Sequence, residues 1–185
     1  IHRILCLFFI LSIVLLGCGA TTTLEPSTDH AKHSNERVLL ANAEVEEGDF
    51  VYRLYTTSDG FNKIVITAEL TYVGEKHSIE IFHGDPILLF TLQESTRDVN
   101  IDMLIREIGA TTTLRKNIPI KKKYNVSNGI ILDNSKANQT FFEKLKTSQV
   151  FPHGEYTING YAIFFSGEDK EHYTIQAVNT FTLSE

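Results

Sequence analysis

Tryptophan is missing from this chain, and cysteine is missing from most of it. The 185 residues include no Trp, one Met and two Cys, and the cysteines are Cys6 and Cys18. A disulfide bond beyond residue 18 is therefore excluded, as is a copper centre that uses a cysteine thiolate there. A domain formed by residues 19–185 must be held together by its hydrophobic core, which a chain of this length can supply.

A surplus of basic residues is also absent. The chain has 17 Lys and Arg against 23 Asp and Glu, which gives a formal net charge of −6. Proteins that bind nucleic acid present a basic face, so this balance predicts no nucleic-acid partner. It also argues against strong docking of a whole domain onto anionic lipid, which attracts Lys and Arg.

The common catalytic motifs are not found either. The sequence contains no Gly-x-Ser-x-Gly, no His-Glu-x-x-His and no glycine-rich loop of the kind that cradles phosphate. A catalytic triad is defined by geometry rather than by order along the chain, so a dispersed triad stays open. We nominate no catalytic residue, expect no cofactor and predict that the protein is not an enzyme.

The amino terminus carries the pattern of a secretory signal. Arg3 precedes an apolar run from Ile4 to Leu16, and Gly17 and Cys18 end it. A basic residue followed by a short apolar segment is typical of a signal peptide, whereas a membrane-spanning helix needs about 20 apolar residues. We therefore expect residues 1–17 to be a signal that is removed.

The end of this run, Leu15-Leu16-Gly17-Cys18, resembles the lipobox of bacterial lipoproteins. The resemblance implies cleavage between Gly17 and Cys18 and attachment of a diacylglycerol to the Cys18 thiol. Two acyl chains hold a protein firmly at a membrane, because each buried CH₂ contributes about 0.8 kcal/mol. The membrane is then a partner through the lipid on Cys18, and the rest of the chain lies on its outer face.

The remainder divides by composition into a tether and a folded domain. Residues 19–34 are polar and aperiodic and contain Pro26, so we predict a lipidated tether over residues 18–48. The folded domain is expected over residues 49–185. Removal of Arg3 with the signal leaves 16 basic and 23 acidic residues in the exported part.

Alternating apolar residues predict strands in this domain. In Lys63–Tyr72 and in the last strand, which contains Tyr173 and Leu183, every second residue is mostly apolar. A long strand is expected over Glu155–Phe165, and His83-Gly84-Asp85-Pro86 is expected to be a turn. Thr140 and Glu143 have the spacing of a capping box, which predicts one short helix.

Strands joined by short turns, with one helical crossover, predict an all-β fold, an antiparallel immunoglobulin-like β-sandwich with one short helix. The segment Phe151–Ile158 resembles the turn that leads into a strand in fibronectin type III and related immunoglobulin-like domains. The segment Gly154–Gly160 is similar to a stretch of BsuPI-type proteinase inhibitor domains, which share the sandwich. The resemblance implies protease inhibition as one alternative function.

The histidines and lysines each allow two interpretations. His83, His153 and His172 are candidates for a metal site at an end of the sandwich, although separate solvated side chains are the more common arrangement. Lys121-Lys122-Lys123 either contacts an anionic surface or guards an edge strand against pairing with another chain, and we favour the guard.

The function that the sequence favours is a non-catalytic binding or adaptor module that holds a protein or another envelope component. Exposed apolar side chains on a sheet face, for example Phe82 or Tyr161, are the expected binding surface. A BsuPI-type protease inhibitor and a metal-binding envelope domain are the two alternatives.

Overall fold

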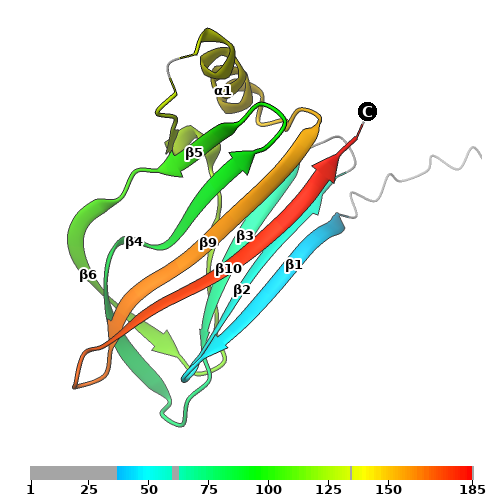
Figure 1. Ribbon diagram of the computed structural model, residues 1–185. Coiled ribbons are helices and arrows are strands. Elements are labelled where there is room, and N and C mark those ends of the chain that lie inside the picture. The colour runs from blue at the N-terminus through cyan, green and yellow to red at the C-terminus, as the bar shows by residue number, and fades with distance from the viewer. Residues whose placement is uncertain (1–36, 60–62, 134, 185) are drawn as a thin grey trace, which may run out of the picture. The chain divides into compact units, whose positions relative to one another are not determined.

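The computed structural model describes residues 37–59, 63–133 and 135–184, and these residues form two antiparallel sheets packed face to face (Figure 1). The smaller sheet has the order β1 (Val38–Glu47), β2 (Phe50–Ser58), β3 (Ile64–Tyr72) and β7 (Ile120–Lys123). The larger sheet has the order β10 (Glu171–Leu183), β9 (Gly154–Ser166), β4 (Ser78–Glu94), β5 (Val99–Met103) and β8 (Gly129–Ile130).

Two further elements complete the architecture. Strand β6 (Arg106–Arg115) pairs with the first half of β4, and a single turn of 3-10 helix (Val126–Asn128) precedes β8. Helix α1 (Lys136–Ser148) leads to β9 and lies at one end of the larger sheet (Figure 1). The expected all-β sandwich with one short helix is therefore confirmed.

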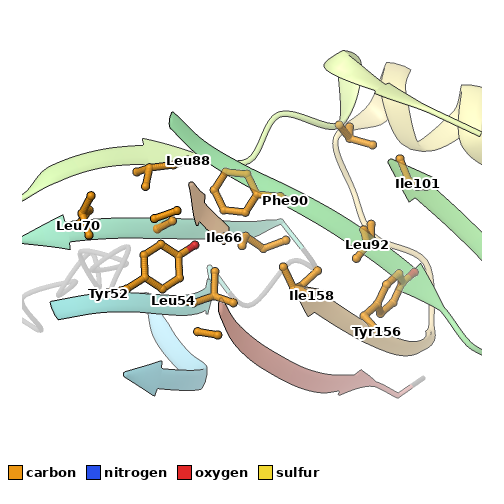
Figure 2. Packing of buried hydrophobic residues seen from close by; sticks show 14 of the residues in the cluster. Tyr52, Leu54, Ile66, Leu70, Leu88, Phe90, Leu92, Ile101, Tyr156 and Ile158 are labelled. Carbon is orange, nitrogen blue, oxygen red and sulfur yellow. The ribbon is translucent and has the colours of Figure 1, made fainter. Parts of the chain in front are cut away.

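Alternation along the strands places the core between the sheets. Every second residue of β10 from Tyr173 to Leu183 is buried, and the residues between them are exposed. Figure 2 shows Tyr52, Leu54, Ile66 and Leu70 of the smaller sheet in the same apolar layer as residues of the larger sheet. A period of two along a strand produces this arrangement, because successive side chains point to opposite faces.

Aromatic rings replace tryptophan as the large core groups. The Phe50 ring packs edge-on against Phe164 and Tyr173, with centroids 4.8 and 4.9 Å apart. Near α1, the Tyr156 and Phe181 rings stack at 5.2 Å. Edge-on and stacked pairs of this kind add to the free energy that burial of the rings supplies.

Helix α1 begins earlier than the capping box at Thr140 predicts. Ser135 is the N-cap, and its hydroxyl accepts a hydrogen bond from the Asn138 amide at 3.2 Å, so α1 begins before Thr140. The Thr140 hydroxyl instead donates to the Lys136 carbonyl at 2.7 Å. Phe141 and Leu145 are buried, so the helix packs on the core through this face, and the start predicted at Thr140 was wrong.

Two other boundaries differ from prediction. The tether was expected to reach residue 48, but Val38–Glu47 form β1, because their backbone pairs with β2 along its whole length. The turn expected at His83–Pro86 lies inside one strand, β4. Its Gly and Pro are accommodated by an irregularity in the pairing with β9 between His83 and Leu88, where the Asp85–Pro86 peptide is cis.

Lys121-Lys122-Lys123 lie on an end strand, as the interpretation that they protect an edge requires. Strand β7 pairs with β3 and is the end strand of the smaller sheet. Lys121 forms an ion pair with Glu69 on the neighbouring strand, with Nζ and Oε1 2.7 Å apart. Charged side chains on an end strand discourage pairing with another chain.

Candidate binding surface

The outer face of the smaller sheet carries paired charges. Arg53 of β2 binds Glu44 of β1, and Glu69 of β3 accepts hydrogen bonds from Lys121 Nζ at 2.7 Å and from the Tyr55 hydroxyl at 2.8 Å. Burial alone would raise the pKa of Glu69, but the hydrogen bonds from Lys121 and Tyr55 keep it below the ordinary value. This face is polar and its charges are matched.

The outer face of the larger sheet differs at the end away from α1. Side chains from β4 and β9 expose apolar surface there: Phe82 is 39% exposed, Ile163 36% and Phe165 44%. Phe82 and Phe165 are direct cross-strand partners. Large contiguous patches of exposed apolar surface are often interaction sites.

A hollow of about 410 Å³ lies within this patch. We call it the outer hollow, and its lining comes from Phe82, His83, Gly84, Gly109, Ala110, Thr111, Ile163, Phe164 and Phe165. Volumes of a few hundred Å³ are typical of ligand pockets in proteins. Its lining is almost wholly apolar, so it suits an apolar side chain rather than a charged ligand.

The outer hollow is open because Gly109 of β6 and Gly84 of β4 have no side chains. A Cβ atom built on Gly109 would meet no heavy atom within 4 Å, and one built on Gly84 would meet only the Arg106 carbonyl, at 3.7 Å. Across the sheet, Phe82 pairs with Thr111 of β6 and Phe165 with His172 of β10. The Phe82 and Phe165 rings of β4 and β9 therefore lie near β6 at a point where Gly109 has no side chain to cover them.

Polar groups border the patch without filling it. The His172 ring lies 4.7 Å from the Phe165 ring, and Lys170 Nζ lies 5.9 Å from the Phe82 ring. The His83 ring nitrogens lie 2.7 Å from the Gly84 carbonyl and 2.7 Å from the Thr112 hydroxyl. Both nitrogens of His83 are therefore engaged within the protein.

The two residues proposed for the binding surface have different positions. Phe82 lines the outer hollow, whereas Tyr161 lies further along β9, where it pairs with Leu89 and Gln176 and is half-buried. Sequence reasoning missed Ile163 and Phe165. The signal for them is that Tyr161–Phe165 is apolar at every position, which a strand with one solvent-facing polar side would not show.

The three candidate metal-binding histidines are not brought together. His83 and His172 lie near the same end of the larger sheet, but His83 pairs with buried Phe164 and His172 with exposed Phe165, on opposite faces. His153 precedes β9, at the other end of that strand. Across the described parts of the chain, no three His, Cys, Asp or Glu side chains are grouped to hold a metal ion.

Two further hollows are lined mainly by polar groups. One, of about 350 Å³, includes Asp85, Arg106 and Lys122, and burial lowers the pKa of Lys122. Another, of about 380 Å³, includes Asp98 and Asp102 beside other polar side chains. Neither resembles the apolar outer hollow in chemistry.

Gly17 and Cys18, the expected cleavage and lipidation sites, lie outside the described residues. Within residues 37–184, as far as the structure describes them, no helix has the length and hydrophobicity of a membrane-spanning helix.

Comparison with known proteins gives little. No protein-family model and no curated protein matches the chain. A crystal structure of a protein from Archaeoglobus fulgidus aligns with 81% of this chain and 99% of its own, at 11% sequence identity and a TM-score of 0.32. A likeness that weak supports no conclusion about function.

Proposed function

We propose that this protein is a lipid-anchored, non-catalytic binding module of a bacterial envelope, and that it holds a protein partner in the outer hollow. The observation that carries this proposal is the exposed apolar cluster of Phe82, Ile163 and Phe165 around a hollow of about 410 Å³. Folding leaves these side chains exposed, and a partner would cover them.

The chemistry of the lining favours binding over catalysis. General acid–base catalysis needs a titratable group that can exchange a proton with a substrate. His83 is the titratable residue in the lining of the outer hollow, but it pairs with buried Phe164, on the face opposite to Phe165, and both its ring nitrogens contact groups of the protein itself. An apolar, shape-based contact is the interaction that this lining provides.

The sequence of the amino terminus supports the proposed location at the outer face of a membrane. The lipobox-like Leu15-Leu16-Gly17-Cys18 supports attachment of lipid to Cys18, and the polar stretch after it supports a tether. The outer hollow would then meet partners outside the membrane.

Photocrosslinking in cells of the source organism tests the binding role. A photoreactive residue replaces Thr111, which borders the outer hollow, and in a matched control it replaces Thr180, which is exposed on β10 and pairs with Thr157. We expect a discrete covalent adduct with one protein from position 111 and none from position 180. Adding Gly109→Trp, which fills the hollow, should remove that adduct.

Equal, diffuse labelling from both positions would contradict the proposal. So would an adduct at position 111 that persists at full yield when Gly109→Trp occupies the hollow, because the partner would then bind elsewhere. Gly109 has open space around it and no left-handed backbone angle, so the Trp variant should fold as the wild type does.

A further inference from the structure

Strand β6 has an open edge beside the outer hollow. Its residues pair with β4 from Ser78 to Asp85, and no other named strand of the described chain pairs with β6. In Figure 1, β6 runs along the side of the larger sheet beyond β4. At the end of β6 the Arg115 carbonyl accepts a hydrogen bond from the Ile118 amide, and Lys116 forms a bridge with Tyr72 of β3. Along Gly109–Leu114, the N–H and C=O groups that point away from β4 are available to another strand.

This edge lacks the protection that another end strand of the molecule has. Strand β7 carries three successive lysines, whereas Gly109–Leu114 of β6 contains neither charge nor proline. Thr111 and Thr113 are exposed and β-branched, and Ile108 is 59% exposed. Such a strand favours pairing with another chain.

The edge and the outer hollow are parts of one surface. Gly109 and Thr111 belong to β6 and also line the hollow, and Phe82 pairs directly with Thr111. A large side chain on a strand added outside β6 can lie across a glycine, because no side chain blocks it there. Opposite Gly109, an aromatic side chain would extend over that glycine towards Phe82.

The ends of β6 add a charge preference. Arg106 and Arg115 are the first and last residues of the strand, and both are exposed. An added segment that carried acidic residues near its ends would meet both guanidinium groups.

We propose that the partner contributes an extended segment, which joins the larger sheet as a strand along β6 and places an aromatic or branched apolar side chain in the outer hollow. This inference rests on the proposed binding function and specifies the class of partner. Backbone hydrogen bonds supply affinity in such strand addition, and side-chain pockets supply specificity.

Selection from a display library of random peptides about ten residues long, the length of a long strand, provides the probe. The bait is the full exported chain, and Gly109→Trp is the counter-selection bait. Wild type should enrich peptides with alternating apolar residues, one of them aromatic, and with acidic ends. The Gly109→Trp variant should bind these peptides about tenfold more weakly or worse, whereas Thr180→Trp should bind them as the wild type does.

Backbone N-methylation of an enriched peptide then separates strand addition from simple apolar binding. Methylation of alternate amides, those that face β6, should weaken binding about tenfold, and methylation of the amides between them should change little. If both sets of methylated peptides bind equally, strand addition is overturned while binding in the outer hollow stands.

Three other outcomes also overturn the inference. Peptides enriched by the wild type and the Gly109→Trp variant alike would show that the edge and hollow are not the site. Enriched peptides with helical rather than alternating spacing would indicate a groove for a helix. Sedimentation of the wild type as a dimer that Gly109→Trp dissociates would assign the edge to a second copy of this chain.

Discussion

At the scale of single residues, the adjacent residues Phe164 and Phe165 of β9 have different roles. Phe164 is 1% exposed and packs against Phe50 in the core, whereas Phe165 is 44% exposed and borders the outer hollow. The difference follows from the two-residue period of the strand, which sends successive side chains to opposite faces. One ring therefore stabilises the fold, and the other remains available to a partner.

Alanine substitutions at these two positions should separate stability from binding. Phe164→Ala should lower the free energy of unfolding by about 3–5 kcal/mol, because it leaves a cavity in the core. Phe165→Ala should lower it by less than about 1 kcal/mol, as is usual for surface positions, and should reduce the crosslink from position 111. Urea denaturation followed by circular dichroism measures both. Equal destabilisation would mean that Phe165 is a core residue and not part of a binding surface.

Glu69 provides a pH-dependent prediction at the same scale. Its pKa is lower in the folded protein than its ordinary value, so it contributes stability above the unfolded pKa, and that contribution disappears as the pH falls through the folded pKa. Glu69→Gln should therefore cost about 1 kcal/mol at pH 7, and this cost should shrink as the pH falls through the folded pKa and the wild-type carboxylate becomes protonated.

Denaturation curves at a series of pH values from 7 downwards measure this change. Glu168→Gln is the control for the loss of one negative charge, because Glu168 is exposed in the turn between β9 and β10. A Glu69→Gln variant whose deficit stays constant or grows on acidification would contradict the role assigned to the Lys121 and Tyr55 hydrogen bonds.

At the scale of elements, the strands of the larger sheet differ in how completely they are paired. Strand β9 lies between β4 and β10 and pairs with both, whereas β6 pairs with β4 on one side. Exposed backbone hydrogen bonds and few neighbours lower the local free energy of opening. The element proposed to receive a partner is thus less constrained than the element that carries the rings.

Hydrogen exchange should show this difference directly. Amides of β9 should exchange slowly throughout Tyr156–Phe164, and alternate amides of β6 within Gly109–Thr113 should exchange much faster because they face solvent. Amide-resolved exchange followed by NMR is the measurement. Uniformly slow exchange along β6 would show that its edge is already covered, which would leave no room for an added strand.

The sequence predicts the strands whose apolar residues alternate with polar ones. In β10 the alternate residues are also the buried ones, whereas in β3 Thr67 and Glu69 are buried as well, although they lie between the apolar residues. Strand β6 was missed because an edge strand is held mainly by backbone pairing, and Leu114 is its one fully buried apolar residue among those described. The break predicted at Gly84 and Pro86 was wrong because the pairing of β4 absorbs both residues in one irregular stretch.

The candidate site depends on contacts that local patterns do not encode. Phe82 and Phe165 are far apart in the sequence and become neighbours because β4 pairs with β9. The opening of the hollow depends on Gly109, and β6 was not predicted as a strand. Phe82 could therefore be proposed from the sequence as an exposed apolar residue, but its partners could not.

At the scale of the whole molecule, the two outer faces of the sandwich differ in chemistry. The smaller sheet presents matched charges such as the Glu69–Lys121 pair, and the larger sheet presents the outer hollow. The exported part has 16 basic and 23 acidic residues, a balance that disfavours its contact with an anionic membrane. A lipid on Cys18 would hold the chain at the membrane, and a tether after it would leave the outer hollow accessible.

Intact mass spectrometry of the protein extracted from membranes of its source organism, beside a Cys18→Ala variant, tests the anchored binding module most directly. We expect a wild-type chain that begins at Cys18 and carries a diacylglycerol, and a variant that is uncleaved or released from the membrane. A wild-type chain that is full-length, unmodified and free of the membrane would contradict the lipid-anchored binding role, because the outer hollow would then face different partners in a different compartment.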